Sequence, residues 1–289
     1  MPLDTLRLES IDFTICNPPF YASQKELLES AAAKSRPPNS ACTGANVEMV
    51  TAGGEVAFVT RMIEESCKLK DRVQWYTTML GKIGSVGTIV ERLKERGVRN
   101  WAVKEFIQGT RTRRWGVAWS WEEMRPSMAI ARGISALPKH LLPFPSEFHC
   151  SVLGASNANL SSKLNETLSA LDLKWQFRAS ILTGLGFAKG NVWSRSARRK
   201  AEKKKAEVWS SKEEDAMDED SEDEEPALGF KVKILPTEEV DRVAVTAVEV
   251  RWLKGNDQVL FESFCGMIQT QLQGTAARNV INFRKQLGD

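Results

Sequence analysis

The chain has 289 residues, of which 42% are hydrophobic, and its formal net charge is +3. This length accommodates one large or two modest domains, and the apolar content is sufficient for a folded core. The sequence contains no apolar stretch of about 18 residues and no signal peptide, so neither a membrane-spanning nor a secreted protein is expected.

The cysteines and histidines argue against a disulfide framework and against a metal centre. The five cysteines are scattered without a Cys-x-x-Cys pair, and the two histidines lie together in a proline-flanked segment. We therefore expect reduced thiols in an intracellular protein and no metal site.

The modest net charge hides a strong asymmetry along the chain. Residues 213–225 carry ten carboxylates and no basic group. Setting these ten negative charges aside leaves +13 on the remainder of the chain, and a body this basic favours RNA as a partner. The acidic insert, at about 210–227, is predicted to be disordered.

The first half of the chain alternates between predicted strands and helices. The periodicity predicts a buried parallel strand at 11–16, a helix at 23–34, a loop at 35–52, a helix at 55–69, a strand at 73–80 and a helix at 86–96. An antiparallel hairpin follows, with strands at 98–107 and 115–121. This order predicts an α/β domain over residues 1–121.

Asn17-Pro18-Pro19-Phe20 directly follows the first predicted strand, and ligands of α/β sheets bind at the carboxyl ends of the strands. The Asn17 side-chain oxygen and the Pro18 carbonyl can accept hydrogen bonds from the amino group of an adenine. This pairing favours a geometry that aims the nitrogen lone pair at a methyl donor. Pro18 and Pro19 stiffen the turn, and Phe20 offers a ring face to an extruded base. For these four residues alone, a plain Pro-Pro turn and a glutamine-modifying methyltransferase remain alternatives.

Five further motifs follow in a defined order. They are Ser35–Pro38 with Thr43-Gly44, Gly53–Val59, Trp75–Lys82, Glu105–Gly109 and Arg114–Ser120. Over roughly residues 10–121 the series resembles the adenine-N6 RNA methyltransferases that act on U6 small nuclear RNA (methyltransferase-like protein sixteen and its fungal relatives) and their bacterial counterpart, RlmF. The resemblance implies a Rossmann-like sheet closed by the hairpin, S-adenosylmethionine as methyl donor and adenosine in structured RNA as substrate. It also implies that Asn17, Pro18, Pro19 and Phe20 are the catalytic residues.

The same resemblance leaves the cofactor site incomplete. The family's fold holds its donor with a glycine-rich loop after a first strand and an acidic residue after a second, and about three strand–helix units should precede residues 11–16. Met1–Ser10 contains no glycine. We therefore expect a shortened gene model, with a splice product or a degenerate copy as alternatives. The domain would then be the C-terminal half of the family's sheet, with an exposed edge at 11–16 and Asn17 as its remaining cofactor contact.

Gly184-Leu185-Gly186 is a second glycine pattern that could in outline hold a cofactor. Basic residues stand about twenty positions later, where an acidic residue is needed to hold a ribose. We predict a turn here instead.

Basic residues near these motifs are candidates for RNA contacts. Arg36 and Lys82 belong to the motifs that carry the resemblance, and the hairpin turn adds Arg111, Arg113 and Arg114; a solvated loop explains these three arginines equally well. A basic run before the acidic insert contributes Arg198, Arg199, Lys200, Lys203 and Lys204. This run predicts a phosphate-binding arm or a nuclear import signal, with a solvated helix end as the alternative. We therefore expect a nuclear protein, with a cytoplasmic pool as an alternative.

The remainder of the chain is predicted to form a linker at 122–145 and a smaller α+β domain at 146–289. Its predicted strands are at 147–152, 174–183, 229–235 and 242–252, and its predicted helices are at 160–171 and 257–273. This part resembles, more weakly, the C-terminal RNA-binding domain of the eukaryotic family, and Asn191-Val192-Trp193 is its best match. Two functions follow for what we expect to be a monomer: an RNA adenine-N6 methyltransferase, or a catalytically silent RNA-binding protein or fragment derived from one.

Overall fold

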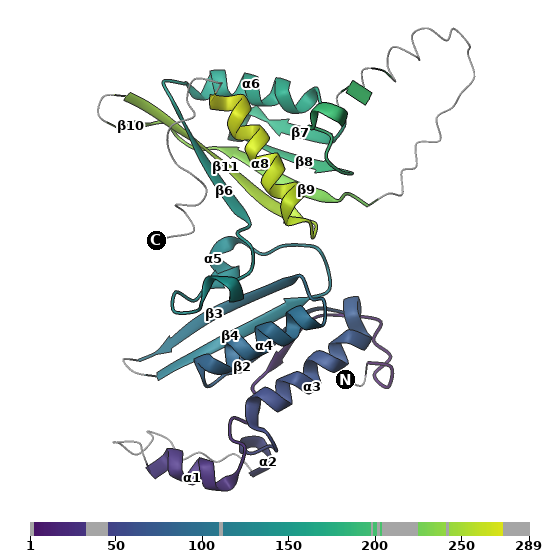
Figure 1. Ribbon diagram of the computed structural model, residues 1–289, viewed down its shortest axis with the longest axis vertical. Coiled ribbons are helices and arrows are strands. Elements are labelled where there is room, and N and C mark those ends of the chain that lie inside the picture. The colour runs from purple at the N-terminus through teal and green to yellow at the C-terminus, as the bar shows by residue number, and fades with distance from the viewer. Residues whose placement is uncertain are drawn as a thin grey trace, which may run out of the picture. The chain divides into compact units, whose positions relative to one another are not determined.

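The structure is a computed structural model that describes residues 3–32, 46–109, 112–197, 199–200, 203, 225–240 and 243–273. The chain divides into two compact units, Met1–Phe144 and Pro145–Asp289. One unit contains a mixed sheet with helices and the other an antiparallel sheet with helices (Figure 1), so the fold is of the mixed α/β kind. Each unit is described by itself.

The first unit follows the predicted alternation of strands and helices. Its elements are β1 (Ile11–Cys16), α1 (Gln24–Ala32), α2 (Asn46–Met49), α3 (Gly54–Leu69), the 3-10 turn η1 (Lys70–Arg72), β2 (Val73–Leu80), α4 (Ile83–Glu95), β3 (Asn100–Gln108), β4 (Thr112–Ser120), α5 (Met128–Ala131), β5 (Arg132–Gly133) and η2 (Lys139–Leu141). The short helix α2 lies in the segment predicted as a loop, and α4 begins three residues before its predicted start.

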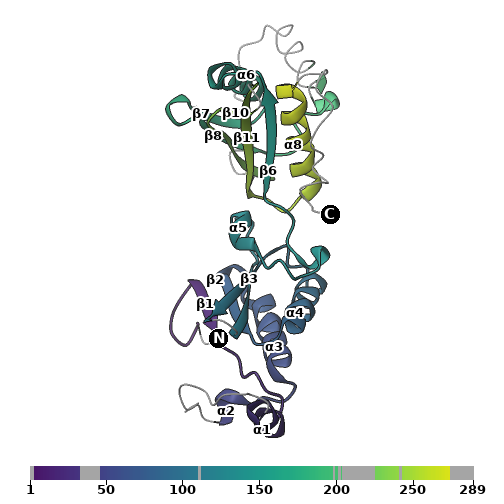
Figure 2. The same cartoon turned by 90° about the vertical axis from the view of Figure 1, so that its left-hand side faces the viewer.

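The strands form one mixed sheet in the order β1-β2-β4-β3-β5. β1 pairs in parallel with β2, whereas β3 and β4 form the predicted antiparallel hairpin. Helices α3 and α4 cover one face of this sheet (Figure 2). Val59 and Ile63 of α3 pack there against Tyr76, Val103 and Trp119 of the strands. The apolar side of each helix thus explains why both helices form on this face.

The first strand was predicted to be buried, and this prediction is wrong. β1 lies at one edge of the sheet, and β2 is its only neighbour among the described strands. As a result, Phe13 is 60% exposed and Ile15 is 82% exposed. The continuous apolar run indicated a strand with both faces covered, but it forms the edge strand whose exposure was also expected.

The segment predicted as a linker, residues 122–145, is packed structure over most of its length. It contains α5, β5 and η2, and β5 pairs in parallel with β3 beyond the hairpin. Ile134, Leu137 and Leu141 are buried in the core of the first unit. The prolines that indicated a linker separate short elements instead.

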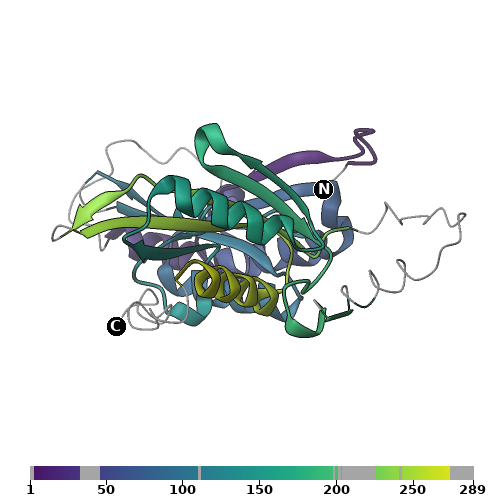
Figure 3. The same ribbon diagram turned by 90° about the horizontal axis from the view of Figure 1, so that it is seen from above.

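The second unit is an antiparallel sheet with two long helices. Its elements are β6 (Glu147–Leu153), α6 (Asn157–Ser169), β7 (Lys174–Arg178), η3 (Ala179–Ile181), β8 (Thr183–Ala188), β9 (Leu228–Ile234), β10 (Glu238–Val240), β11 (Val243–Lys254) and α8 (Gln258–Gln273). The strand order is β10-β11-β9-β8-β7, with β6 also paired to β11. Helices α6 and α8 contact each other (Figure 3). Among the described helices, none has the length and apolar content that crossing a bilayer requires.

The long strand predicted at 174–183 is a hairpin of two shorter strands. β7 ends at Arg178, and Leu182 takes a left-handed conformation with φ of 50° before β8 begins. The Gly184-Leu185-Gly186 pattern therefore lies inside a strand and forms neither the predicted turn nor a cofactor loop. A Cβ atom on Gly186 would lie 2.2 Å from Cζ of Phe230, so this glycine is required by an aromatic ring packed against the strand.

This close approach gives a testable prediction for the second unit. Substituting Gly186 with alanine should lower the free energy of unfolding of the second unit by about 1–3 kcal/mol, because the added methyl group must displace a buried ring. Gly190→Ala is the matched control, since no heavy atom lies within 4 Å of its added Cβ. Denaturant unfolding of the two variants measures the difference, and equal stability would contradict the packing.

Candidate active site

The Asn17-Pro18-Pro19-Phe20 tetrapeptide leaves the carboxyl end of β1. Asn17 is exposed, Pro18 and Pro19 are buried, and Phe20 is half-buried. Neither the Asn17 amide nor the Pro18 carbonyl forms a hydrogen bond with another described residue. The exposed Asn17 amide is therefore open to a ligand, and neither of the two acceptors that the sequence singled out is engaged by another described residue.

Backbone hydrogen bonds hold the chain directly after the tetrapeptide. The Tyr21 N–H donates to the Met49 carbonyl at 3.1 Å, and the Thr51 N–H donates to the Tyr21 carbonyl at 3.0 Å. Tyr21 and Val50 thereby form an isolated parallel bridge. This bridge connects the tetrapeptide to the start of α3.

The ring of Phe20 lies between a glycine and an arginine. A Cβ atom on Gly81 would lie 3.1 Å from Cδ1 of Phe20, so only glycine leaves the ring its present space at the end of β2. The Arg114 guanidinium of β4 lies 5.4 Å from the Phe20 ring centroid, a distance at which a cation is attracted to an aromatic face. One of the three predicted hairpin arginines thus reaches the tetrapeptide.

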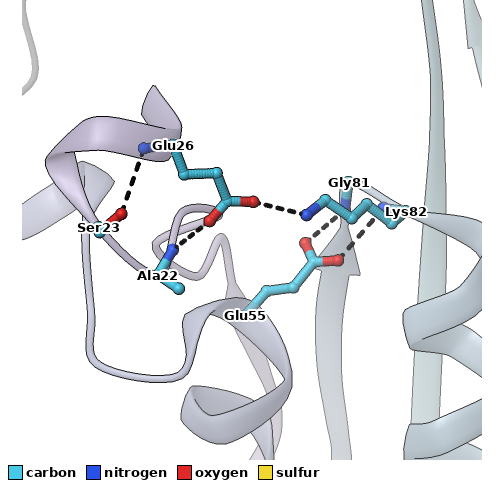
Figure 4. A network of polar contacts seen from close by, with 6 residues as sticks. All are labelled: Ala22, Ser23, Glu26, Glu55, Gly81 and Lys82. Carbon is cyan, nitrogen blue, oxygen red and sulfur yellow. Dashed lines mark hydrogen bonds and ion pairs between the residues drawn. The ribbon is translucent and has the colours of Figure 1, made fainter. Parts of the chain in front are cut away.

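A buried carboxylate holds the turn between β2 and α4 (Figure 4). Glu55, at the start of α3, is 3% exposed. Its Oε2 accepts the Gly81 N–H at 2.7 Å and its Oε1 accepts the Lys82 N–H at 3.2 Å. Hydrogen bonds from two backbone donors satisfy the carboxylate and fix the β2–α4 turn against Phe20.

A second, exposed carboxylate joins the start of α1 to the same turn (Figure 4). The Lys82 ammonium lies 2.8 Å from Oε1 of Glu26, and Oε2 of Glu26 accepts the Ala22 N–H at 2.8 Å. These two hydrogen bonds, the one from Lys82 first, lower the pKa of Glu26, and the hydrogen bond to Glu26 raises the pKa of Lys82. Lys82, predicted to contact RNA, is engaged by Glu26 in this structure.

The Glu26–Lys82 pair should be sensitive to acid. Because the pKa of Glu26 is lowered from its ordinary value of 4.5, the stabilisation is complete above that value and is lost as the pH falls through the lowered one. Relative to Glu26→Gln, the wild type should exchange the amides of α1 more slowly by roughly twofold or more near neutral pH. The two proteins should become equal in acid, and a difference that persists there would contradict the assignment.

An apolar groove of about 410 Å³ lies beside Asn17. Its lining comes from β1 to β4 and α5: Ile15, Cys16, Asn17, Thr77, Thr78, Met79, Ala102, Lys104, Phe106, Gly116, Val117, Ala118 and Ile130. Burial raises the pKa of the Cys16 thiol, so this neighbour of Asn17 is not an activated nucleophile. Within the described part of the chain, no group of three metal-ligating side chains is present either.

The other predicted RNA contacts are scattered. Arg113 forms an ion pair with Glu105 at 2.7 Å. Arg199, Lys200 and Lys203 are exposed in the second unit, and their predicted role stays a prediction. Arg36, Arg111, Arg198 and Lys204 lie outside the described residues, as does nearly all of the acidic insert.

Sequence reasoning missed Glu26, Glu55 and the role of Gly81. One signal was present for Glu26: Ser23 and Glu26 have the spacing of a helix capping box, and the Ser23 hydroxyl accepts the Glu26 N–H at 3.2 Å. Glu55 and Gly81 stand in the motifs that carried the family resemblance. Nothing in their local pattern indicates that they meet.

Comparison with known proteins places these residues among RNA methyltransferases. Residues 5–123 match the model of a family described as RNA methyltransferase. The chain is 30% identical over 270 residues to the U6 small nuclear RNA (adenine-(43)-N(6))-methyltransferase of Schizosaccharomyces pombe, covering 93% of this chain and 62% of that protein. It is 44% identical over 190 residues to the human RNA N(6)-adenosine-methyltransferase METTL16, covering 63% of this chain and 33% of that protein.

Among solved structures, the hMettl16 catalytic domain in complex with MAT2A 3'UTR hairpin 1 is 40% identical and covers 44% of this chain and 45% of that chain. The TM-score of 0.39 is too low to support an argument about shared geometry. The chain spans less than two thirds of the fission yeast relative and about a third of the human one. The segment that contains the tetrapeptide lies within residues 5–123, which are similar to this RNA methyltransferase family.

Proposed function

We propose that this chain is part of an S-adenosylmethionine-dependent RNA adenine-N6 methyltransferase that acts on structured RNA of the U6 small nuclear RNA kind. The observation that carries the proposal is the Asn17-Pro18-Pro19-Phe20 turn at the end of β1, whose two acceptors no other described residue engages and whose ring is half-buried. The family model described as RNA methyltransferase covers these residues, and relatives named for this activity match 93% and 63% of the chain. On this proposal the parallel β1–β2 pair and the hairpin are the C-terminal half of a Rossmann-like sheet.

The residues of this chain would present the base. The Asn17 side-chain oxygen and the Pro18 carbonyl accept the two amino hydrogens of adenine, which orients the nitrogen lone pair. Phe20 stacks under the base, and its own position is fixed by Gly81 and Arg114. Catalysis by such a site is orientation and electrostatic preorganisation, and it needs no general base.

The fit to the methyl donor is partial. S-adenosylmethionine supplies an activated methyl group when bound. Asn17 borders the groove, and the family resemblance implies that it contacts the donor. Within those residues we identify no glycine-rich turn with a following acidic residue that would hold the donor's ribose, since Gly184 and Gly186 lie inside β8.

The test combines donor binding with methyl transfer. S-adenosylmethionine is titrated calorimetrically into the full chain, and a U6-type RNA hairpin is then assayed for N6-methyladenosine by mass spectrometry. Donor binding together with methylated product supports the enzyme.

The second candidate function is an RNA-binding protein that no longer transfers methyl groups. The observation that favours it is the same partial fit to the donor. Tight RNA binding without donor binding would support this function and contradict the enzyme. Absence of both would contradict the two candidates together.

The second unit is proposed to be an RNA-binding accessory domain. Asn191 and Trp193, from the motif that carried its resemblance, both donate to the Ser263 hydroxyl of α8, at 3.4 and 3.0 Å. Trp193 is buried against Phe264. These two residues therefore fasten the segment at 191–193 to the helix, and the proposed nuclear location rests on the basic run that follows in the sequence.

A further inference from the structure

One face of the sheet in the second unit is turned away from its helices. Trp175, Phe230 and Phe264 stack between the sheet and α8 on the covered side, and Asn165 of α6 accepts the Trp175 indole N–H. Side chains alternate along a strand, so the residues between these positions occupy the opposite side. That side, which we term the open face, carries Lys174, Arg178, Leu185, Phe187, Lys231, Lys233 and Arg251.

Strand register places these residues in rows across three or four strands. The middle row is Gln176, Leu185, Lys231 and Arg251, and the next is Arg178, Thr183, Lys233 and Glu249. A third row places Lys174 beside Phe187. Since neighbouring strands lie about 4.8 Å apart, the cations form a compact array.

The charge on the open face is unbalanced. Its five cations face two carboxylates in these rows, Glu249 opposite Lys233 and Glu147 opposite Arg251. Lys174, Arg178, Lys231 and Lys233 form no ion pair with another described residue. The Arg251 Nε is buried without a hydrogen-bond partner in the described part of the chain, although such groups are normally satisfied.

One cross-strand pair on this face brings two cations together, with the Glu147 carboxylate on the far side of Arg251. Lys231 and Arg251 stand directly opposite each other on adjacent strands, and like charges in that position destabilise a sheet. An anionic ligand that bridges the two side chains would remove this repulsion. The pair therefore points to a polyanion as the occupant.

Apolar side chains lie among the cations. Leu185 is 40% exposed beside Lys231, and Phe187 is 36% exposed beside Lys174. Cations interleaved with an exposed aromatic ring on a sheet are the combination that binds RNA, because the cations contact phosphates and the ring stacks on a base. An exposed ring among the cations therefore favours a nucleic acid, whose bases can stack on it, as the occupant.

We propose that the open face of the second unit binds the sugar–phosphate backbone of structured RNA, with Lys231 and Arg251 at its centre and Phe187 against a base. Its residues are other than those of the basic run at 198–204. It rests on the proposed function in that RNA is the ligand. The Lys231–Arg251 pair then places two cations against the RNA backbone.

The test compares RNA affinity with thermal stability, because the proposal expects Lys231→Glu to lower the affinity without lowering the stability. Lys231→Glu should weaken binding of a fluorescently labelled RNA hairpin to the full chain by about tenfold at low salt, and should reduce the slope of log affinity against log salt by about one. The thermal midpoint of the same variant should stay unchanged or rise, because glutamate opposite Arg251 replaces repulsion with attraction. Phe187→Ala should weaken binding with little change in the slope.

Lys68→Glu is the matched control. Lys68 is an exposed lysine of α3, and its substitution changes the net charge by the same amount. Unchanged affinity in Lys231→Glu, or an equal loss in Lys68→Glu, would overturn the open face as the site. A lowered thermal midpoint with lost binding would also overturn it, because the loss would then be structural. If the wild-type chain binds no RNA at all, the proposed function fails as well, whereas unaltered binding by Lys231→Glu leaves that function intact.

Discussion

Replacing Asn17 with alanine is expected to lower methyl transfer to an RNA hairpin by about 100- to 1000-fold, the usual effect of removing one preorganised polar group from an active site. Asn17 is exposed at the end of β1, and its amide has no partner among the described residues. Its loss therefore leaves the fold intact and removes one of two acceptors for the adenine amino group. RNA affinity should stay near the wild-type value, because most RNA binding comes from phosphate contacts elsewhere.

The measurement is single-turnover methylation with RNA affinity determined in parallel. Asp12→Ala is the control, since Asp12 is an exposed residue of the same strand, and its activity should match the wild type. Equal losses of affinity and activity in Asn17→Ala would show that Asn17 contributes to binding alone. Retention of more than about a tenth of the activity would contradict the role of Asn17 in presenting the base.

The elements that position the site could be predicted because their patterns are local. β1 and β2 have the predicted bounds, and α3 begins within one residue of its predicted start. β-branched and aromatic residues in short runs indicate strands, and apolar residues at helical spacing indicate helices. The tetrapeptide at the end of a strand was visible for the same reason.

Features that depend on distant partners were not predictable. Gly186 required the ring of Phe230, which lies far along the chain, and the pattern around it indicated a turn. The prolines of residues 122–145 indicated a linker, but whether Ile134 and Leu141 are buried depends on the core they meet. In the site, Glu55 reaches Gly81 across 26 positions, and no local spacing encodes that contact.

Glu55→Ala is expected to destabilise the first unit by about 2–4 kcal/mol, because two backbone N–H groups lose their acceptor in a buried place. The Glu55 carboxylate accepts both the Gly81 and the Lys82 N–H, and it is 3% exposed. Hydrogen exchange should show the effect first at these two amides. Glu55→Gln keeps one acceptor oxygen and turns an amide donor toward the second N–H, so its stability should lie between those of alanine and the wild type.

Glu55→Gln distinguishes the contribution of Glu55 to stability from its contribution to the position of Phe20. Since Gly81 packs against Phe20, a loosened β2–α4 turn gives the ring more than one position. Methyl transfer by the folded fraction of Glu55→Gln should then fall, while RNA affinity remains. Glu64→Ala changes another residue of α3 and removes its ion pair with Arg96 at the end of α4; it should leave transfer unchanged. Wild-type exchange rates at Gly81 and Lys82 in Glu55→Ala would mean that the carboxylate is dispensable and that the backbone alone holds Phe20 in place.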